Sequence, residues 1–382
     1  MVRDSALFYD VRRTYEQNYR EGPFGAFAEA LAADTADVPR HTASDAGDAP
    51  DAAPDYELFG NPIDLPFGIP AGPLLNSRFT TAAFRMGFDV AVYKTVRSRA
   101  WDCNPFPNVL AVHPDAPDGA LHPGDPQLYE GVLADDRYEQ PLSISNSFGV
   151  PSRDPDQWQP DMRDAIAAAG QGQLLVPSFQ GSRVAGMDTE AYIADHVTTA
   201  RLVAETGARL MEMNTSCPNE GRNRLLCNDP TLVGTIAEAV KSEIGDMPLI
   251  VKLAAMATDA ELERMVDETA AHGRVQGFAA INTISGRLVD RDGRQALPGE
   301  GREHSGICGA AIREAGLDMV RRLSAIRARR GLRFVIVGVG GVDSPSDYQE
   351  YREAGADVVM SATGAMWNPN LAREIREVRS VR

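Results

Sequence analysis

Lysine is nearly absent from this chain of 382 residues. Of its 38 basic residues only three are lysines, namely Lys94, Lys241 and Lys252, so arginine serves wherever any positive charge is enough. Lys94 and Lys252 each end an apolar, β-branched run, whereas Lys241 lies in a pattern typical of an exposed helix position. A compact ammonium can approach a planar ligand more closely than the broad guanidinium of arginine. Lys94 and Lys252 are therefore candidate ligand-binding residues, although a biased codon usage would also leave a few lysines by chance.

Cysteine, metal-binding patterns and long apolar runs are scarce as well. The four cysteines form no CxxC pair and the six histidines form no HExxH or HxH pattern, which predicts neither a disulfide framework nor a protein-bound metal. No apolar run approaches the roughly 18 residues of a membrane span, and no charged-then-apolar leader opens the chain. We therefore expect a protein of the reducing cytoplasm without a cleaved signal.

The net charge is −16. A surface of this sign cannot neutralise phosphates, so the charge argues against a nucleic-acid partner. Adaptation to a salt-rich cytoplasm is a second interpretation of the same charge.

Eight short apolar segments alternate with helical patterns from residue 56 onwards. They cover residues 65–72, 89–96, 174–181, 209–216, 248–254, 277–284, 333–341 and 356–364. The intervening stretches 188–207, 229–245 and 259–273 begin at Asp, end at Gly and repeat apolar residues at helical spacing. Strands of seven to nine residues, buried on both faces and alternating with helices, predict an α/β fold of the (β/α)8 TIM-barrel type. The competitor, a doubly wound sheet, usually carries GxGxxG after its first strand, and GIPAGP at 68–73 is different.

The first 55 residues differ in composition from the rest. Residues 9–34 could form one or two helices, and the Ala/Asp/Pro-rich residues 33–55 resemble a linker or a lid. We accordingly divide the chain into an N-terminal helical and acidic extension (1–55) and a barrel (56–382).

The carboxyl ends of the predicted strands should converge on one face of the barrel, where such barrels keep their chemistry. The residues there are small, polar and mostly uncharged: Ala71, Gly72, Lys94, Thr95, 214–219, Lys252, Asn282, Thr283, Gly340, Gly341, Ala362 and Thr363. The glycine pair at 340–341 and the pair Ala362–Thr363 follow strands seven and eight, as in the phosphate site of TIM barrels. Gly306 and Gly309 could widen that cradle. A simple turn is the other interpretation of a glycine pair after a strand.

Two of these strand ends carry reactive side chains. A buried lysine must meet an anion or a carbonyl, so Lys252 would bind a ligand unless it pairs with an inward carboxylate such as Glu212. Cys217 stands between Asn214 and Asn219, whose amides cannot trap a thiolate in an ion pair, and such a cysteine can act as a proton acceptor. The alternative is that Cys217 is a small buried filler, as we expect of Cys227 and Cys308.

Together these motifs resemble the dihydroorotate dehydrogenase family of FMN-dependent (β/α)8 barrels and the related FMN domain of dihydropyrimidine dehydrogenase. The resemblance runs from about residue 56 to the C-terminus, and its most specific element is N-x-S-C-P-N at 214–219. NSFGVP at 146–151 is similar to the substrate loop of the family. Further motifs follow in family order: KT at 94–95, NPFP at 104–107, VKL at 251–253, NTISG at 282–286, GVGGV at 338–342 and SATG at 361–364.

The resemblance implies roles for individual residues. Cys217 would remove the C5 proton of the substrate while the C6 hydride passes to flavin N5, and Lys94 would touch both flavin and substrate. The implied substrate-binding residues are Asn146, Phe148, Gly149, Val150, Asn214, Asn219, Asn282 and Thr283. The implied FMN-binding residues are Ala71, Gly72, Lys94, Thr95, Asn214, Lys252, Gly306, Gly340, Gly341, Ala362 and Thr363.

The implied reaction is the oxidation of dihydroorotate to orotate in pyrimidine biosynthesis, by a homodimer. Cysteine at 217 resembles the soluble class; the quinone-linked class has serine there but carries an N-terminal helical extension, as this chain does. We do not expect membrane docking, and the electron acceptor is not implied. Residues 217–233 and 360–369 look more like dihydropyrimidine dehydrogenase, so another dihydropyrimidine or cyclic amide is the alternative substrate. A flavin- or phosphate-binding protein without redox turnover is a third hypothesis.

Overall fold

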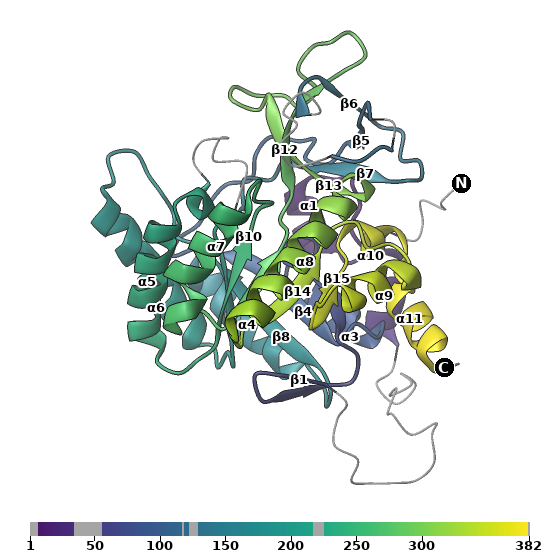
Figure 1. Ribbon diagram of the computed structural model, residues 1–382. Helices are drawn as coiled ribbons and strands as arrows, with labels where there is room; N and C mark the ends of the chain where they lie inside the picture. The colour runs from purple at the N-terminus through teal and green to yellow at the C-terminus, as the bar shows by residue number, and fades with distance from the viewer. Residues whose placement is uncertain (1–6, 34–55, 117, 122–128, 217–224, 381–382) are drawn as a thin grey trace.

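The computed structural model describes residues 7–33, 56–116, 118–121, 129–216 and 225–380 (Figure 1). Eight parallel strands close into a barrel in the order β10-β11-β14-β15-β3-β4-β8-β9. They are β3 (Phe67–Ile69), β4 (Val90–Val96), β8 (Leu174–Phe179), β9 (Met211–Asn214), β10 (Leu249–Leu253), β11 (Gly277–Ala280), β14 (Val335–Val339) and β15 (Val358–Met360). Each predicted segment contains one of these strands, in the predicted order, which confirms the TIM barrel.

The seven residues of β4 agree with the predicted length, but the other strands are shorter than predicted, down to three residues in β3 and β15. Their predicted lengths were wrong because residues at one or both ends of each predicted segment lie outside the ladder. Close packing also limits the barrel: a Cβ at Gly68 of β3 would lie 1.9 Å from the Val90 carbonyl oxygen of β4, so only glycine fits there.

Helices follow the barrel strands and cover the outside of the barrel (Figure 1). They are α3 (Ser77–Arg85), α4 (Pro155–Ala167), α5 (Thr189–Ala204), α6 (Pro230–Ile244), α7 (Asp259–Glu268), α8 (Arg313–Arg330), α9 (Pro345–Glu353), α10 (Thr363–Trp367) and α11 (Leu371–Ser380), with the short 3₁₀ turns η4 (Leu226–Asn228), η5 (Ala270–His272) and η6 (Ala310–Ile312). Asp188 and Asp229 cap α5 and α6 as predicted. The cap of α7 is Thr258 rather than Asp259, because the Thr258 hydroxyl and the Glu261 carboxylate form a reciprocal capping box.

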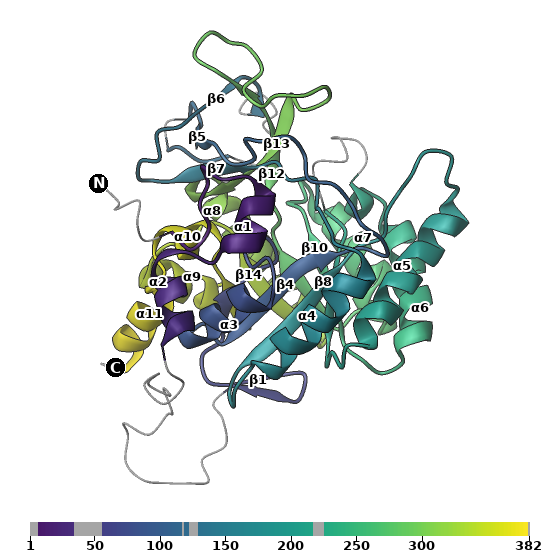
Figure 2. The ribbon, with the colours of Figure 1, turned by 180° about the vertical axis from the view of Figure 1, so that it is seen from behind.

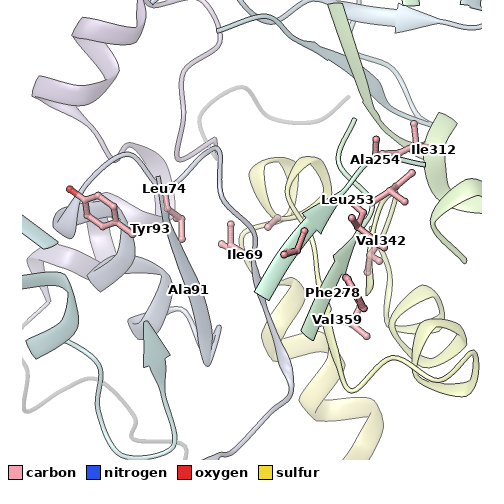
Figure 3. Close-up of a cluster of buried hydrophobic side chains, with 14 of the residues drawn as sticks. Ile69, Leu74, Ala91, Tyr93, Leu253, Ala254, Phe278, Ile312, Val342 and Val359 are labelled. Carbon is pink, nitrogen blue, oxygen red and sulfur yellow. The ribbon is translucent and has the colours of Figure 1, made fainter. Parts of the chain in front are cut away.

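Two apolar clusters hold the barrel together. One lies inside it: Val90, Val92, Leu174 and Val176 pack there with Leu58 of the hairpin β1 (Tyr56–Leu58) and β2 (Asn61–Ile63). The other lies between strands and helices and includes Ala91, Tyr93 and Phe278 (Figure 3). Successive residues of β4 thus join different clusters, which is why the strands are apolar on both faces.

A second, smaller barrel stands over the mouth of the first (Figure 1). Its strands are β5 (Ala111–His113), β6 (Val132–Asp135), β7 (Ser143–Asn146), β12 (Ile284–Val289) and β13 (His304–Gly309), in the order β12-β13-β7-β5-β6. They come from two long insertions, one after β4 and one after β11. Neither this barrel nor its strands were predicted from the sequence.

The N-terminal segment packs against the side of the large barrel. It forms two helices, α1 (Tyr15–Glu21) and α2 (Gly25–Ala32), which lie next to α3 in Figure 2. Arg85 of α3 donates hydrogen bonds to the carbonyl oxygens of Ala30 and Leu31 at the end of α2. Among the described residues, no helix combines the length and the apolar character needed to cross a membrane.

Candidate active site

One cavity lies between the mouth of the large barrel and the small barrel above it. The sequence predicted many of the residues that line it: Ala71, Gly72, Lys94, Thr95, Asn146, Phe148, Val150, Asn214, Lys252, Asn282, Thr283, Gly340, Gly341, Ala362 and Thr363. They converge because parallel strands in register bring their carboxyl ends to one face. Gly149 and Gly306 do not line the cavity, and Cys217 and Asn219 lie outside the described residues. The structure thus brings together residues from seven of the eight strand ends and from the loop at 146–150.

Sequence reasoning missed much of the apolar wall. The additional lining residues are Tyr9, Pro70, Pro73, Val109, Ile144, Ser145, Ile281, Cys308, Ile312, Val339, Val342, Gly364 and Met366, whereas Gly309, which the sequence suggested for the cradle, does line the cavity. Cys308, which the sequence assigned to packing, faces Thr363 with 3.6 Å between Oγ1 and Sγ, and burial raises the pKa of its thiol to about 11. Val109 and Ile144 belong to the insertion after β4. That insertion reaches the cavity only through the second barrel, which the sequence did not predict.

Lys252 on β10 is buried, with 4% of its surface exposed, and lines the cavity. Its ammonium group makes no ion pair or hydrogen bond with any described residue. Glu212, the carboxylate that could have paired with it, accepts a hydrogen bond from the Ser178 hydroxyl at 3.0 Å instead. A buried cation without a protein partner is costly unless a ligand completes it, so Lys252 indicates a ligand with a negative or carbonyl-bearing edge.

Side-chain amides form a connected group beside Lys252. The Asn282 amide donates to Asn214 Oδ1 at 3.2 Å and to the Ser216 hydroxyl at 3.1 Å, while its own oxygen accepts from the Thr283 backbone N–H at 2.8 Å. The Thr283 hydroxyl is buried and has no hydrogen-bond partner among the described residues. A buried, unsatisfied hydroxyl is unusual in a folded protein. It therefore marks a place where a polar ligand atom fits.

Part of the cavity wall is formed by backbone without side chains. Gly340 and Gly341 follow β14 with φ angles of 135° and 66°, which favour glycine. A Cβ at Gly341 would lie 2.6 Å from that of Arg313, and one at Gly364 would lie 2.2 Å from the Val342 carbonyl oxygen. Backbone exposed without side chains in this way can present N–H groups to an anion. The arrangement suits the phosphate of a cofactor.

Arg97, just after β4, is a buried cation that contacts several segments near the cavity. Only 2% of it is exposed. It donates hydrogen bonds to the carbonyl oxygens of Val150 at 3.0 Å, Gly149 at 3.4 Å and Gly181 at 3.3 Å. Its guanidinium also stacks over Trp101, with 4.4 Å between the carbon atom and the ring centroid. Arg97 thereby ties the loop at 146–150 to the end of β8.

The loop that Arg97 holds has an unusual backbone. Val150 is β-branched yet has a φ of 52°, a strained conformation for such a residue, and Gly149 before it has a φ of 77°. On its other side Arg97 lies 2.8 Å from the side-chain amide of Gln180, which in turn contacts the Asn214 amide at 2.7 Å. A single buried guanidinium thus supports both the strained loop and an amide of the cavity wall.

Replacing Arg97 with lysine should lower the free energy of unfolding by about 3 kcal/mol, because one ammonium cannot reach all these acceptors and buried carbonyls lose their donors. Arg99 provides the matched control. Its side chain is 48% exposed and pairs with the buried Asp195. Asp195 also accepts hydrogen bonds from the Ser98 hydroxyl and the Ser182 backbone N–H, so Arg99→Lys should cost less than about 1 kcal/mol. Urea unfolding of both variants measures the difference, and equal stabilities would show that Arg97 does not hold the loop.

Comparison with known proteins identifies the family. The family model described as dihydroorotate dehydrogenase matches residues 138–378. A dihydroorotate dehydrogenase from Dictyostelium discoideum is 32% identical over 370 residues, which is 95% of each chain. The chain belongs to the dihydroorotate dehydrogenase family. It is thus an oxidoreductase by descent, as the motifs at 146–151 and 214–219 indicated.

Two more similarities agree with this membership of the dihydroorotate dehydrogenase family. A dihydroorotate dehydrogenase (quinone) from Thermobifida fusca is 28% identical over 319 residues, covering 81% of this chain and 74% of the relative. The crystal structure of the Eimeria tenella enzyme in complex with ferulenol superposes with a TM-score of 0.64 at 18% identity, covering 84% of this chain and 82% of the other. At that identity the superposition supports the fold alone.

Proposed function

We propose that this protein catalyses the FMN-dependent oxidation of dihydroorotate to orotate. The observation that carries the proposal is the composition of the cavity. It combines a glycine cradle after β14, a buried Lys252 that lacks a partner among the described residues, and a connected set of uncharged amides. A ligand set with an anionic group, an electron-rich ring edge and a cyclic imide would satisfy all three.

The residues present fit FMN. Gly340, Gly341, Ala362 and Thr363 would receive its phosphate, and Ala71 and Gly72 would lie beside its ring. Lys252 would face the pyrimidine edge, where its charge would stabilise negative charge that builds up on reduction. When bound, FMN would supply the two-electron acceptor for the C6 hydride of the substrate.

The chain itself supplies the groups that hold the substrate and move its proton. Asn214, Asn282 and Thr283 would pair with carbonyl and N–H groups of the substrate ring, and Thr283 would thereby satisfy its buried hydroxyl. Cys217 would accept the C5 proton, since a thiolate among uncharged amides is not neutralised by an ion pair. The support for Cys217 is its place in the 214–219 motif, because its structure is not described.

Related substrates form the second candidate. The similarity of residues 217–233 and 360–369 to dihydropyrimidine dehydrogenase favours another dihydropyrimidine or cyclic amide. The roles of Lys94 and of Gly306, the homodimer and the cytoplasmic location all stay predictions. The electron acceptor is not implied by any residue of the cavity.

Anaerobic titration of the flavin tests the function. The purified protein should be yellow, release FMN on denaturation, and lose its visible absorbance when dihydroorotate is added under nitrogen. Bleaching by dihydrouracil but not by dihydroorotate would select the second candidate. A colourless protein that releases no flavin would contradict both and leave a binding protein without redox turnover.

A further inference from the structure

We propose that Tyr9 of the N-terminal segment is a substrate-binding residue, whose hydroxyl donates a hydrogen bond to an acceptor oxygen of the ring substrate. The inference rests on the proposed function and goes beyond it, because it assigns a part of the binding site to a region outside the barrel. None of the motifs in the sequence pointed to this region. Three observations support the inference: how the segment is anchored, how its turn is fixed, and where Tyr9 lies.

The segment is anchored by aromatic packing. Phe8 stacks on Phe27 of α2 with 4.1 Å between the ring centroids and meets Phe79 of α3 edge-on at 6.4 Å. Both Phe8 and Phe27 are completely buried. Offset and edge-to-face pairs of this kind add to the free energy gained from burial. Position 8 is therefore held against the outer face of the barrel, one residue before Tyr9.

The turn that follows Tyr9 is fixed by a buried amide. Asn18 of α1 is fully buried; its oxygen accepts from the Asp10 backbone N–H at 2.8 Å, and its nitrogen donates to the Asp10 carbonyl oxygen at 2.9 Å. The same nitrogen reaches the carbonyl oxygens of Arg13 and Thr14. One side chain thus fixes both backbone groups of residue 10. Tyr9 lies between this clamp and the aromatic anchor, so its direction is set in advance.

Tyr9 forms part of the cavity wall. It is 3% exposed, lines the cavity, and its ring meets the Phe148 ring edge-on at 5.9 Å. Phe148 lies in the loop at 146–150, to which we assign the substrate. The Tyr9 hydroxyl makes no hydrogen bond with any described residue, and a buried phenol ordinarily finds a partner. Burial raises the pKa of this phenol well above 10, so it stays a hydrogen-bond donor at physiological pH.

Tyr15 provides a matched control for Tyr9, because both side chains pack against the ring of Phe148. It is 4% exposed and meets Phe148 at 6.2 Å, yet it does not line the cavity. Tyr9→Phe and Tyr15→Phe each remove one buried hydroxyl and keep the aromatic packing on Phe148. Only the first change removes a group that the cavity can use.

The experiment compares both variants with the wild type as FMN-loaded proteins. Orotate affinity is measured from the change in the flavin absorbance spectrum, and KM and kcat are measured for dihydroorotate and, separately, for an artificial electron acceptor. Tyr9→Phe should weaken orotate binding and raise the KM for dihydroorotate about 10-fold, which is the effect of one lost hydrogen bond to a charged or strongly polar ligand. Tyr15→Phe should stay within about twofold, and both variants should keep the wild-type flavin content and Tm.

Wild-type affinity for orotate in Tyr9→Phe, or an effect confined to the KM of the electron acceptor, would overturn the inference and leave the proposed function intact. Equal losses in both variants would also overturn it, because they would reflect the packing around Phe148. A wild-type protein that neither binds orotate nor is bleached by dihydroorotate would overturn the proposed function, and the role of Tyr9 with it.

Discussion

Cys217→Ala should slow the reduction of bound flavin by dihydroorotate by about 10² to 10⁴-fold, the range for loss of a positioned base. Flavin content and orotate affinity should change little, because alanine removes the proton acceptor and leaves the amides at 214 and 282 in place. Anaerobic stopped-flow mixing with excess dihydroorotate measures the rate directly. Because this half-reaction does not involve the electron acceptor, the result does not depend on knowing that acceptor.

Cys103→Ala is the control for this experiment. Cys103 is partly buried outside the cavity lining, and burial raises the pKa of its thiol to about 11, so its removal should leave the reduction rate within about twofold. Cys308 serves as the competing candidate because it does line the cavity. Normal reduction in Cys217→Ala together with slow reduction in Cys308→Ala would transfer the role of base to Cys308.

The large barrel could be predicted because its physical signature is local. Strands such as β4 are buried on both faces and therefore read as continuous apolar runs between capped helices. The strand lengths could not be predicted in the same way, since an apolar residue at a barrel mouth looks like one inside the ladder. The cap of α7 shows a similar limit: Thr258 and Asp259 are both good caps in isolation, and the capping box with Glu261 decides between them.

The residues of the cavity likewise divide into those that the sequence could place and those that it could not. Residues at strand ends, such as Lys252 and Asn282, could be placed from the sequence because the barrel topology alone brings them together. Tyr9, Val109 and Ile144 could not, because their positions depend on how the N-terminal segment and the second barrel dock. Arg97 could not be predicted for another reason. Arginine is the common cation of this chain, so the residue type alone does not distinguish a buried guanidinium from an exposed one.

Contacts with the protein distinguish Lys252 from Lys241 in a chain that otherwise uses arginine. Lys241 is on α6, and its ammonium donates to the Met247 carbonyl oxygen at 2.7 Å, a contact that does not involve the cavity. Lys252 has no such contact among the described residues. An ammonium on a flexible stem can remain inside the barrel mouth without filling it, whereas a guanidinium would occupy the space of the ligand. The structural difference between the two lysines therefore separates a surface role from a binding role.

Replacing Lys252 with methionine should leave the FMN-free protein at least as stable, but it should weaken FMN binding and slow flavin reduction. The FMN-free protein should unfold at the same or a higher temperature, because a buried charge without a partner is exchanged for an apolar chain of similar length. FMN binding should weaken, and the bound flavin should be reduced about 10²-fold more slowly, as when one preorganised group at a developing negative charge is lost.

Lys241→Met, which removes a lysine outside the cavity, should leave flavin affinity and reduction rate unchanged. Thermal unfolding without FMN, flavin titration and stopped-flow reduction measure the three effects. A Lys252→Met protein that is markedly less stable without FMN, yet binds and reduces it normally, would mean that Lys252 supports the fold and not the ligand.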